Sequence, residues 1–357
     1  MSRQAPPPLP DPLAPARGTR ALGGGRRRRR LRSRKGLAIA AMLIAPLAVA
    51  AAAYLSFGVD DGSSGTPAAR SATGAAPPAA GAASIPPTPQ EQGPFTRTEP
   101  VPDVRLSGVD AFHARLRRPP RAGLVFDVRT GEVLWRHRPL ARVPMASLTK
   151  IMTALLVVER TRPNEPVRIT RAALRYSGQG VGLLPRGKRV RLETLLNGML
   201  IVSGNDAAIA LAVHVSGSER RFVRQMNRRA RTWGLECTHF ASSHGLEDGN
   251  RSCARDLAVL TRLAMSKRRI RRIVRRRQVA FRFPIKRRKL YLTGHNPLQR
   301  IGYRGTIGLK TGYTSAAGRC FVGVVRRRGR TLGVVLLGSH DPSRQAPKLL
   351  DAALKAP

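Results

Sequence analysis

Three short polar strings in the last two thirds of the sequence contain the side chains that serine-based acyl transfer needs. They are Ser147-Leu-Thr-Lys150, Ser203-Gly-Asn205 and Lys310-Thr-Gly312, and their first residues lie 56 and then 107 positions apart. Each string alone is common by chance. Together they supply a nucleophilic hydroxyl, a lysine base, a second hydroxyl that can relay a proton, and a cation for a substrate carboxylate. We therefore interpret the chain as an enzyme.

Ser147 and Lys150 are expected on one face of a helix. Residues 147–160 place apolar side chains at three- and four-residue intervals, which predicts a mostly buried helix that begins at the serine. Residues three apart share a face, so the ammonium would lie beside the hydroxyl. A desolvated lysine near other cations loses its proton more easily and can act as a base. A serine here can also be only an N-cap, and that alternative stays open.

The other two strings are expected where regular elements end. Ser203-Gly-Asn205 separates apolar stretches at 192–201 and 206–215, which we predict as helices. An ordinary turn capped by Asn205 or Asp206 would explain this string equally well. Lys310-Thr-Gly312 ends a predicted strand, where glycine would let a substrate backbone lie along the strand edge.

The order of predicted elements indicates the fold class. Strands are expected at both ends of the region after residue 105, with helices between them; their ranges are 123–128, 132–135, 302–310, 320–326 and 331–337. This order predicts an α/β chain of the α+β type, with an antiparallel sheet flanked by helices and an all-helical subdomain. We expect the catalytic domain over 106–345 and the end of a C-terminal helix over 346–357.

The first 105 residues have a different composition. Residues 1–35 are rich in Pro and Arg and predict a disordered basic tail. Residues 36–59 contain no charged residue, and Asp60 follows them. As a helix they would rise about 36 Å, enough to cross a bilayer core of about 30 Å. Residues 60–105 have the composition of a flexible linker.

The charges on either side of the apolar run predict its orientation. Arginines precede 36–59 and two aspartates follow it, so the tail is expected in the cytoplasm and the catalytic domain outside, in a single-pass membrane protein. A cleaved signal peptide, which would give a secreted protein, is the alternative.

The formal net charge of +45 would ordinarily suggest a nucleic-acid partner. Only nine of the 65 basic residues are Lys, however, and aromatic residues make up only 4% of the chain. Few aromatics leave little surface for base stacking, and the Arg excess is typical of a GC-rich genome. We therefore expect no nucleic-acid partner.

A basic segment over Lys267–Lys289 contains no acidic residue. Apolar spacing within it predicts a short helix and then a strand. One interpretation is a solvated face of the helical subdomain and its hairpin. Our hypothesis is a patch that holds the protein on anionic wall polymers or lipid headgroups.

The three cysteines have different expected roles. In an exported chain, Cys237 and Cys253 are predicted to form a disulfide, and Cys320, within an apolar run, to be a buried free thiol. A zinc site of Cys237, His239, His244 and Cys253 can be drawn, but its spacing matches no common zinc motif.

The stretches around the three strings resemble the D-alanyl-D-alanine carboxypeptidases, which are low-molecular-mass penicillin-binding proteins of serine peptidase family S11. The resemblance covers about 118–340 and rests mainly on 144–159, 203–212 and 308–319. It implies removal of the terminal D-Ala from peptidoglycan stem pentapeptides through an acyl-enzyme, inhibition by β-lactam antibiotics, and no cofactor or metal.

The resemblance also implies residue roles. Ser147 would be the acylated nucleophile and Lys150 its base, while Ser203 relays a proton and Asn205 positions the substrate. The substrate would lie against Lys310, Thr311, Gly312 and Tyr313, with Lys310 and Thr311 on its carboxylate. The backbone N–H groups of Ser147 and Tyr313 would form the oxyanion hole.

Three other functions fit parts of the same pattern. A DD-endopeptidase that cuts peptidoglycan crosslinks uses the same residues. A β-lactamase adds a Glu-x-x-Leu-Asn string, but here Glu193-Thr-Leu-Leu-Asn197 precedes Ser203 instead of following it, so we interpret these two residues as surface and capping residues. A non-enzymatic wall- or nucleic-acid-binding protein would need the arginines and not the three strings.

Overall fold

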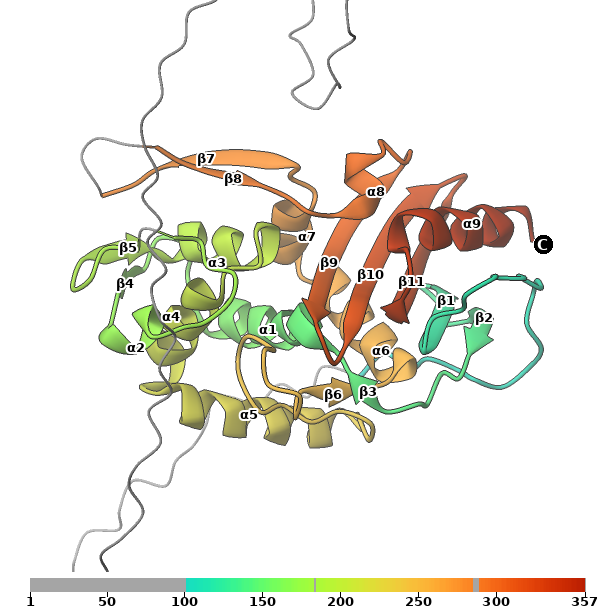
Figure 1. The fold of residues 1–357 in the computed structure, drawn as a ribbon, viewed down its shortest axis with the longest axis horizontal. Helices are drawn as coiled ribbons and strands as arrows, with labels where there is room; N and C mark the ends of the chain where they lie inside the picture. Colours follow the sequence, from blue (N-terminus) through green and yellow to red (C-terminus); the bar gives the residue numbers. More distant parts are fainter. Residues whose placement is uncertain (1–100, 183, 285–288, 357) are drawn as a thin grey trace, which may run out of the picture. The chain divides into compact units, whose positions relative to one another are not determined.

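Five strands from the two ends of the catalytic region form one antiparallel sheet. The computed structural model describes residues 101–182, 184–284 and 289–356. The sheet has the order β2-β1-β11-β10-β9 (Figure 1). Its strands are β1 (Ala122–Asp127), β2 (Val133–His137), β9 (Thr306–Thr314), β10 (Gly318–Arg327) and β11 (Arg330–Ser339). The predicted antiparallel sheet is therefore confirmed.

Helices cover both faces of the sheet, which explains why its strands are nearly continuous apolar runs. Leu124 and Phe126 of β1 face the core beneath α6 (Ala254–Ser266). Val125, between them, faces the smaller core beneath α9 (Pro342–Lys355). Successive side chains of a strand point to opposite faces, so one sequence run serves two cores.

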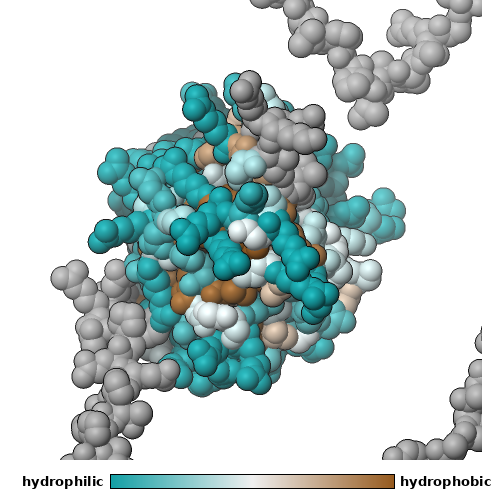
Figure 2. Space-filling view, turned by 90° about the vertical axis from the view of Figure 1, so that its left-hand side faces the viewer, coloured by the Kyte–Doolittle hydropathy of each residue, from teal (hydrophilic) through white to brown (hydrophobic). Residues whose placement is uncertain are grey.

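Most of the remaining helices form the predicted helical region beside the sheet (Figure 1). It comprises α1 (Lys150–Arg160), α2 (Arg171–Leu174), α3 (Leu192–Ile201), α4 (Asn205–Ser216), α5 (Glu219–Thr232) and the hairpin of β4 (Pro166–Arg168) and β5 (Arg189–Arg191). Figure 2 shows the end that carries this hairpin, where hydrophilic residues surround a small hydrophobic area. The apolar sides of these helices are thus turned mainly inward.

Short elements connect the two regions. They are β3 (Val143–Pro144) paired with β6 (Arg251–Ser252), α7 (Arg268–Val274), the hairpin of β7 (Gln278–Arg282) and β8 (Lys289–Thr293), and α8 (Pro297–Arg300). The helix and strand expected in the basic segment are α7 and β7.

The predicted strand at 302–310 is misplaced by several residues. Asn296 caps α8, and Gly302 and Gly305 adopt positive φ in the turns that follow, so the chain becomes extended only at Thr306. β9 then continues through the whole Lys310-Thr-Gly312 string to Thr314. The string lies within the strand, not at its end.

None of the helices in the described ranges is long and apolar enough to cross a membrane. The basic tail, the apolar run at 36–59 and nearly all of the linker at 60–105 lie outside those ranges.

Glu193 and Asn197 are not surface residues, so that prediction was wrong. They are 6% and 0% exposed on α3. Glu193 accepts from the Arg269 and Arg272 guanidiniums at 2.8 and 3.3 Å, and Asn197 accepts from Arg276 at 2.9 Å. Part of the basic segment therefore packs inward, where its arginines join α7 to α3.

Replacing Glu193 with glutamine is expected to lower the free energy of unfolding by about 2 kcal/mol, because Arg269 keeps its burial and loses its charged acceptor. Urea denaturation measures this change. The exposed Glu132 offers a control, since Glu132→Gln should change stability by less than about 0.5 kcal/mol. Equal effects of the two changes would contradict a structural role for the α3–α7 ion pairs.

The structure also shows the state of the three cysteines. Cys237 and Cys253 form a disulfide with a Cα–Cα distance of 5.5 Å, so their sulfurs are not available as zinc ligands. Cys320 is a buried free thiol, and burial raises its pKa to about 11. A thiol with so high a pKa is a poor nucleophile at neutral pH.

Candidate active site

Ser147 lies in a single 3-10 turn, η1 (Ala146–Thr149), that leads directly into α1. The N-cap of η1 is Met145 and that of α1 is Thr149, so Ser147 caps neither helix. Ala146, just before it, is held at a φ of 48°, in the left-handed region that alanine rarely adopts. The local backbone is thus strained where it presents the hydroxyl.

Lys150 has three hydrogen-bond partners, and its side chain is fully buried. Its Nζ lies 2.9 Å from Ser147 Oγ, 2.7 Å from Asn205 Oδ1 and 2.6 Å from the His244 carbonyl oxygen. Burial, followed by the charge of Lys310, holds the pKa of Lys150 well below its ordinary value. These conditions favour a neutral amine.

The partners of Lys150 direct its lone pair. A neutral amine has two N–H groups, and the amide oxygen of Asn205 and the His244 carbonyl oxygen can only accept hydrogen bonds. When both N–H groups are used there, the lone pair remains for the Ser147 hydroxyl. Asn205 presents its oxygen because its Nδ2 donates to the Ser177 carbonyl at 2.8 Å.

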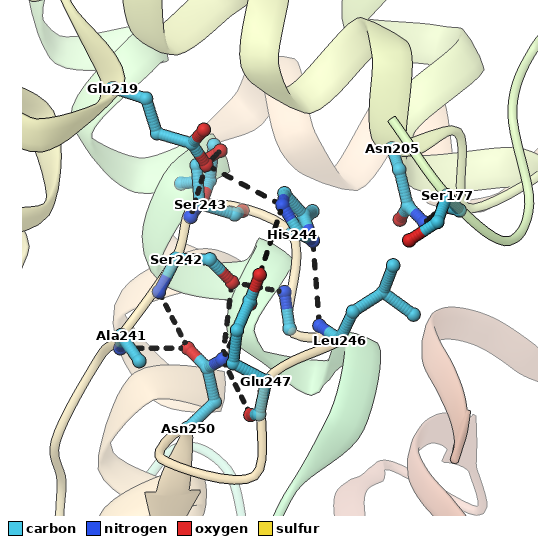
Figure 3. A network of polar contacts seen from close by, with 12 residues as sticks. Ser177, Asn205, Glu219, Ala241, Ser242, Ser243, His244, Leu246, Glu247 and Asn250 are labelled. Atoms are coloured by element: carbon cyan, nitrogen blue, oxygen red, sulfur yellow. Dashed lines mark hydrogen bonds and ion pairs between the residues drawn. The ribbon is translucent and has the colours of Figure 1, made fainter. Parts of the chain in front are cut away.

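The carbonyl of His244 belongs to a loop that is fixed by side-chain hydrogen bonds (Figure 3). Asn250 Oδ1 accepts from the backbone N–H groups of Ala241 and Ser242 at 3.1 and 3.2 Å. Glu219 accepts from the backbone and side chain of Ser243 at 3.0 and 2.6 Å. The loop can therefore hold one carbonyl in place against the lysine.

Ser203 is also held in an unusual conformation. Its φ is 64°, and it directly precedes Gly204, the N-cap of α4. Neither Asn205 nor Asp206 caps this helix, in contrast to the alternative left open by the sequence. Asp206 instead accepts from the backbone N–H groups of Val181 and Gly182 at 2.8 and 3.1 Å. It thereby ties the loop before β5 to the start of α4.

β9 forms the opposite wall. Gly312 lies so close to the serine turn that a Cβ atom there would be 2.9 Å from the backbone nitrogen of Ser147. Lys310 is 2% exposed, donates to the Thr311 carbonyl at 2.8 Å, and has its pKa lowered to about 7 by burial. Since β9 is an edge strand of the described sheet, it can pair with an extended substrate.

A cavity of about 520 Å³ joins these parts. Six of the predicted residues line it, namely Ser147, Ser203, Asn205, Thr311, Gly312 and Tyr313. The buried Lys150 and Lys310 lie behind this surface, where they act on the serine and on the charge of the site. The structure thus brings all three strings together around one serine.

Several residues at this cavity were not predicted as site residues. His295, Arg300 and Arg319 line it, and no Asp or Glu is among its lining residues in the described ranges. Burial and the nearby Lys310 lower the pKa of His295. The Ser177 and His244 carbonyls were also missed, because a backbone acceptor has no signature in residue type.

The fold is that of the DD-peptidases and penicillin-binding proteins, and its cavity places a buried lysine beside a serine hydroxyl. The family profile of D-alanyl-D-alanine carboxypeptidases (peptidase S11) matches residues 119–341. This chain belongs to that family.

Individual relatives agree with this assignment. The D-alanyl-D-alanine carboxypeptidase DacF of Bacillus subtilis is 31% identical over 67% of this chain and 63% of its own length. A D-alanyl-D-alanine endopeptidase of Haemophilus influenzae is 32% identical over 60% of this chain and 74% of its own length. The crystal structure of a Mycobacterium tuberculosis D-alanyl-D-alanine carboxypeptidase is similar with a TM-score of 0.62 and 31% identity, over 67% of this chain and 92% of that one. This chain therefore spans less than two thirds of the Bacillus subtilis relative.

Proposed function

We propose that this protein is a serine-type D-alanyl-D-alanine carboxypeptidase that removes the terminal D-Ala from peptidoglycan stem pentapeptides. The observation that carries the proposal is the buried Lys150, whose amine has two fixed acceptors and a third partner, Ser147. Family membership supports the substrate class.

The first half-reaction forms an ester. Ser147 Oγ bonds to the carbonyl carbon of the penultimate D-Ala as the hydroxyl proton passes to Lys150 Nζ. We assign the backbone N–H groups of Ser147 and Tyr313 to stabilise the oxyanion. The peptide C–N bond then breaks, and the proton passes through Ser203 to the amine of the departing D-Ala.

In the second half-reaction, water hydrolyses the ester. The water loses a proton to Lys150 as it attacks, and the ester C–O bond breaks while Ser147 regains its hydroxyl proton. Glu193 is not positioned to act as the deacylating base of a β-lactamase. On α3 it is paired with Arg269 and Arg272, and it does not line the cavity. We therefore expect the penicilloyl ester to persist and penicillins to inhibit the protein.

A DD-endopeptidase is the second candidate, and the endopeptidase relative favours it. The purified protein should be given a stem pentapeptide and a crosslinked peptide dimer in parallel, with products followed by mass spectrometry. Release of D-Ala from the pentapeptide at a kcat/KM at least about tenfold above dimer cleavage supports the carboxypeptidase. The reverse ratio would replace it with the endopeptidase.

We also propose that residues 36–59 anchor the protein in the cell membrane, with the N-terminus in the cytoplasm and the catalytic domain outside. The uncharged run and the charges around it support this placement. Protease treatment of intact spheroplasts should digest the catalytic domain and leave the tail protected. Protection of both parts would contradict it.

Substrate binding is expected to weaken as the pH rises through about 7. The Lys310 ammonium attracts the substrate carboxylate, and with a pKa of about 7 in the free protein this charge is present below that pH and lost above it. The dissociation constant of an N-acyl-D-Ala-D-Ala peptide should therefore increase between pH 6 and 9, which equilibrium binding to the Ser147→Ala variant measures. Lys310→Arg in the same background should give a flat profile, because arginine stays charged. A flat profile with Lys310 present would contradict the role.

A further inference from the structure

A second, larger cavity lies at the other end of the β9–β10 hairpin from Ser147. Its volume is about 850 Å³, and β9 contributes Ile307 to it, whereas the active-site cavity takes Thr311, Gly312 and Tyr313. Ile307 lies four positions before Thr311 and six before Tyr313, which corresponds to roughly 13 to 20 Å of extended strand. No residue of the described part of the chain lines both cavities. We call this second cavity the rear cleft.

Among the described residues, the rear cleft is lined by basic residues from several elements and by no acidic residue. These are Arg129 after β1, Arg262 and Lys267 at the end of α6, Arg271 and Arg275 in and after α7, and Arg326 at the end of β10. Leu263, Met265 and Ile307 supply an apolar floor. Guanidinium groups around an apolar surface suit a ligand that carries both carbon chains and anionic groups.

Two of these arginines are fixed in the protein. Arg262 donates to the backbone carbonyls of Val128 and Arg129 at 2.9 and 2.6 Å and to that of Asp103. Arg271 donates to the Met265 carbonyl at 2.6 Å. These contacts hold the junction of α6, α7 and the β1–β2 turn, and so give the cleft a built shape.

Other arginines of the cleft are available to a ligand. Arg129, Arg275 and Arg326 are exposed, and no carboxylate in the described part of the chain forms an ion pair with them. Acidic side chains near the cleft act on other lining residues: Asp103 and Asp127 act on Arg262, and Glu159 forms an ion pair with Lys267 at 3.9 Å. Asp127 already accepts from the backbone N–H groups of Arg129 and Thr130 at 2.7 and 3.1 Å.

The basic surface continues beyond the cleft. A neighbouring hollow of about 580 Å³ shares Arg326 and adds Arg304, Arg327 and Arg328. Of these, Arg327 is paired with Asp351 at 3.5 Å, while Arg304 and Arg328 are exposed. Two adjoining hollows with a shared arginine form a track, which suits an extended chain with repeated charges better than a single small anion.

We propose that the rear cleft binds a linear polymer with repeated phosphodiester groups, of the polyol-phosphate type. Arginine forks match phosphate oxygens in pairs, which supports phosphate as the anion. A flat bilayer cannot enter a concave cleft, which disfavours lipid. In the described ranges no aromatic residue lines either hollow for base stacking, which disfavours nucleic acid. From the sequence alone, anionic-polymer binding is expected at Lys267–Lys289, whereas the binding surface proposed here is formed by several elements. This proposal does not depend on the proposed peptidase activity.

The test compares two double variants of the full-length protein in detergent. Arg275→Gln with Arg326→Gln removes two exposed charges from the rear cleft. Arg220→Gln with Arg224→Gln removes two exposed charges from α5, outside both hollows. The basic N-terminal tail is common to all the proteins, so a difference between the variants reports on the cleft.

Fluorescence anisotropy with a labelled glycerol phosphate oligomer measures the dissociation constant at fixed salt. The cleft variant should bind at least about tenfold more weakly than wild type, and the α5 variant within about twofold. Both should keep wild-type labelling by a fluorescent penicillin, which checks that they are folded.

Three results would overturn the proposal. Equal weakening in the two variants would mean diffuse charge attraction. Equal affinity for a single-stranded DNA oligonucleotide of the same charge would make the cleft a nucleic-acid site. If the wild type bound phosphatidylglycerol vesicles and not the oligomer, and the cleft variant lost this vesicle binding, the rear cleft would be a membrane contact.

Discussion

Replacing Lys150 with alanine is expected to reduce acylation of Ser147 by at least about 10³-fold, close to the loss in Ser147→Ala, because base and nucleophile act as a unit. The amine is the only group that the structure places within hydrogen-bond distance of the Ser147 hydroxyl among the described residues. Stopped-flow measurement with a fluorescent penicillin gives the acylation rate constant.

The alanine variant needs a folding control, because it removes a fully buried side chain. Alanine also leaves the Asn205 and His244 oxygens without their donor, which costs stability. Lys150→Met keeps most of the volume and lacks the amine, so it should be folded by circular dichroism and equally slow. A folded Lys150→Met protein that acylates at more than about a tenth of the wild-type rate would contradict the assigned role.

Replacing Gly245 with alanine is expected to reduce the acylation rate by about 100-fold or more. Gly245 has a φ of +92°, and a Cβ there would lie 2.2 Å from the Ala146 carbonyl oxygen, within the turn that presents Ser147. The turn or the His244 loop must therefore move, and small displacements of reacting groups have large effects on rate. The same acylation assay measures the change.

Gly234 offers a matched control for backbone strain. Its φ is +62°, and no heavy atom within 4 Å would meet a Cβ there. Gly234→Ala should therefore lose about 1 kcal/mol of stability from the left-handed conformation and keep its acylation rate. If both alanine variants acylated normally, the packing of Gly245 against the serine turn would have no catalytic role.

The fold was largely predictable because its elements have strong local patterns. α3 begins and ends at the predicted residues, because all ten positions from Leu192 to Ile201 are buried and mostly apolar, which makes the helix recognisable in the sequence. The start of β9 was missed because Gly302 and Gly305 adopt positive φ in successive turns, and the chain becomes extended only at Thr306. Turn conformation at a glycine is decided by its neighbours in space, and these are not visible in the sequence.

The site was predictable only where its chemistry depends on side-chain type. Ser147 and Lys150 are three residues apart, so their contact is local. The His244 carbonyl contributes a peptide oxygen that any residue has, and its partner is 94 residues away. The burial of Glu193 was missed for a related reason, because Arg269 lies 76 residues further along the chain.

Covalent labelling with a fluorescent penicillin tests the central claim most directly. Full-length wild-type protein and Ser147→Ala should be labelled side by side, and the modified peptide identified by mass spectrometry. A stable adduct on Ser147 in the wild type, with none in the variant, is the predicted result. A folded wild-type protein that forms no adduct, or an adduct that persists in Ser147→Ala, would contradict the assignment of Ser147 as the acylated nucleophile.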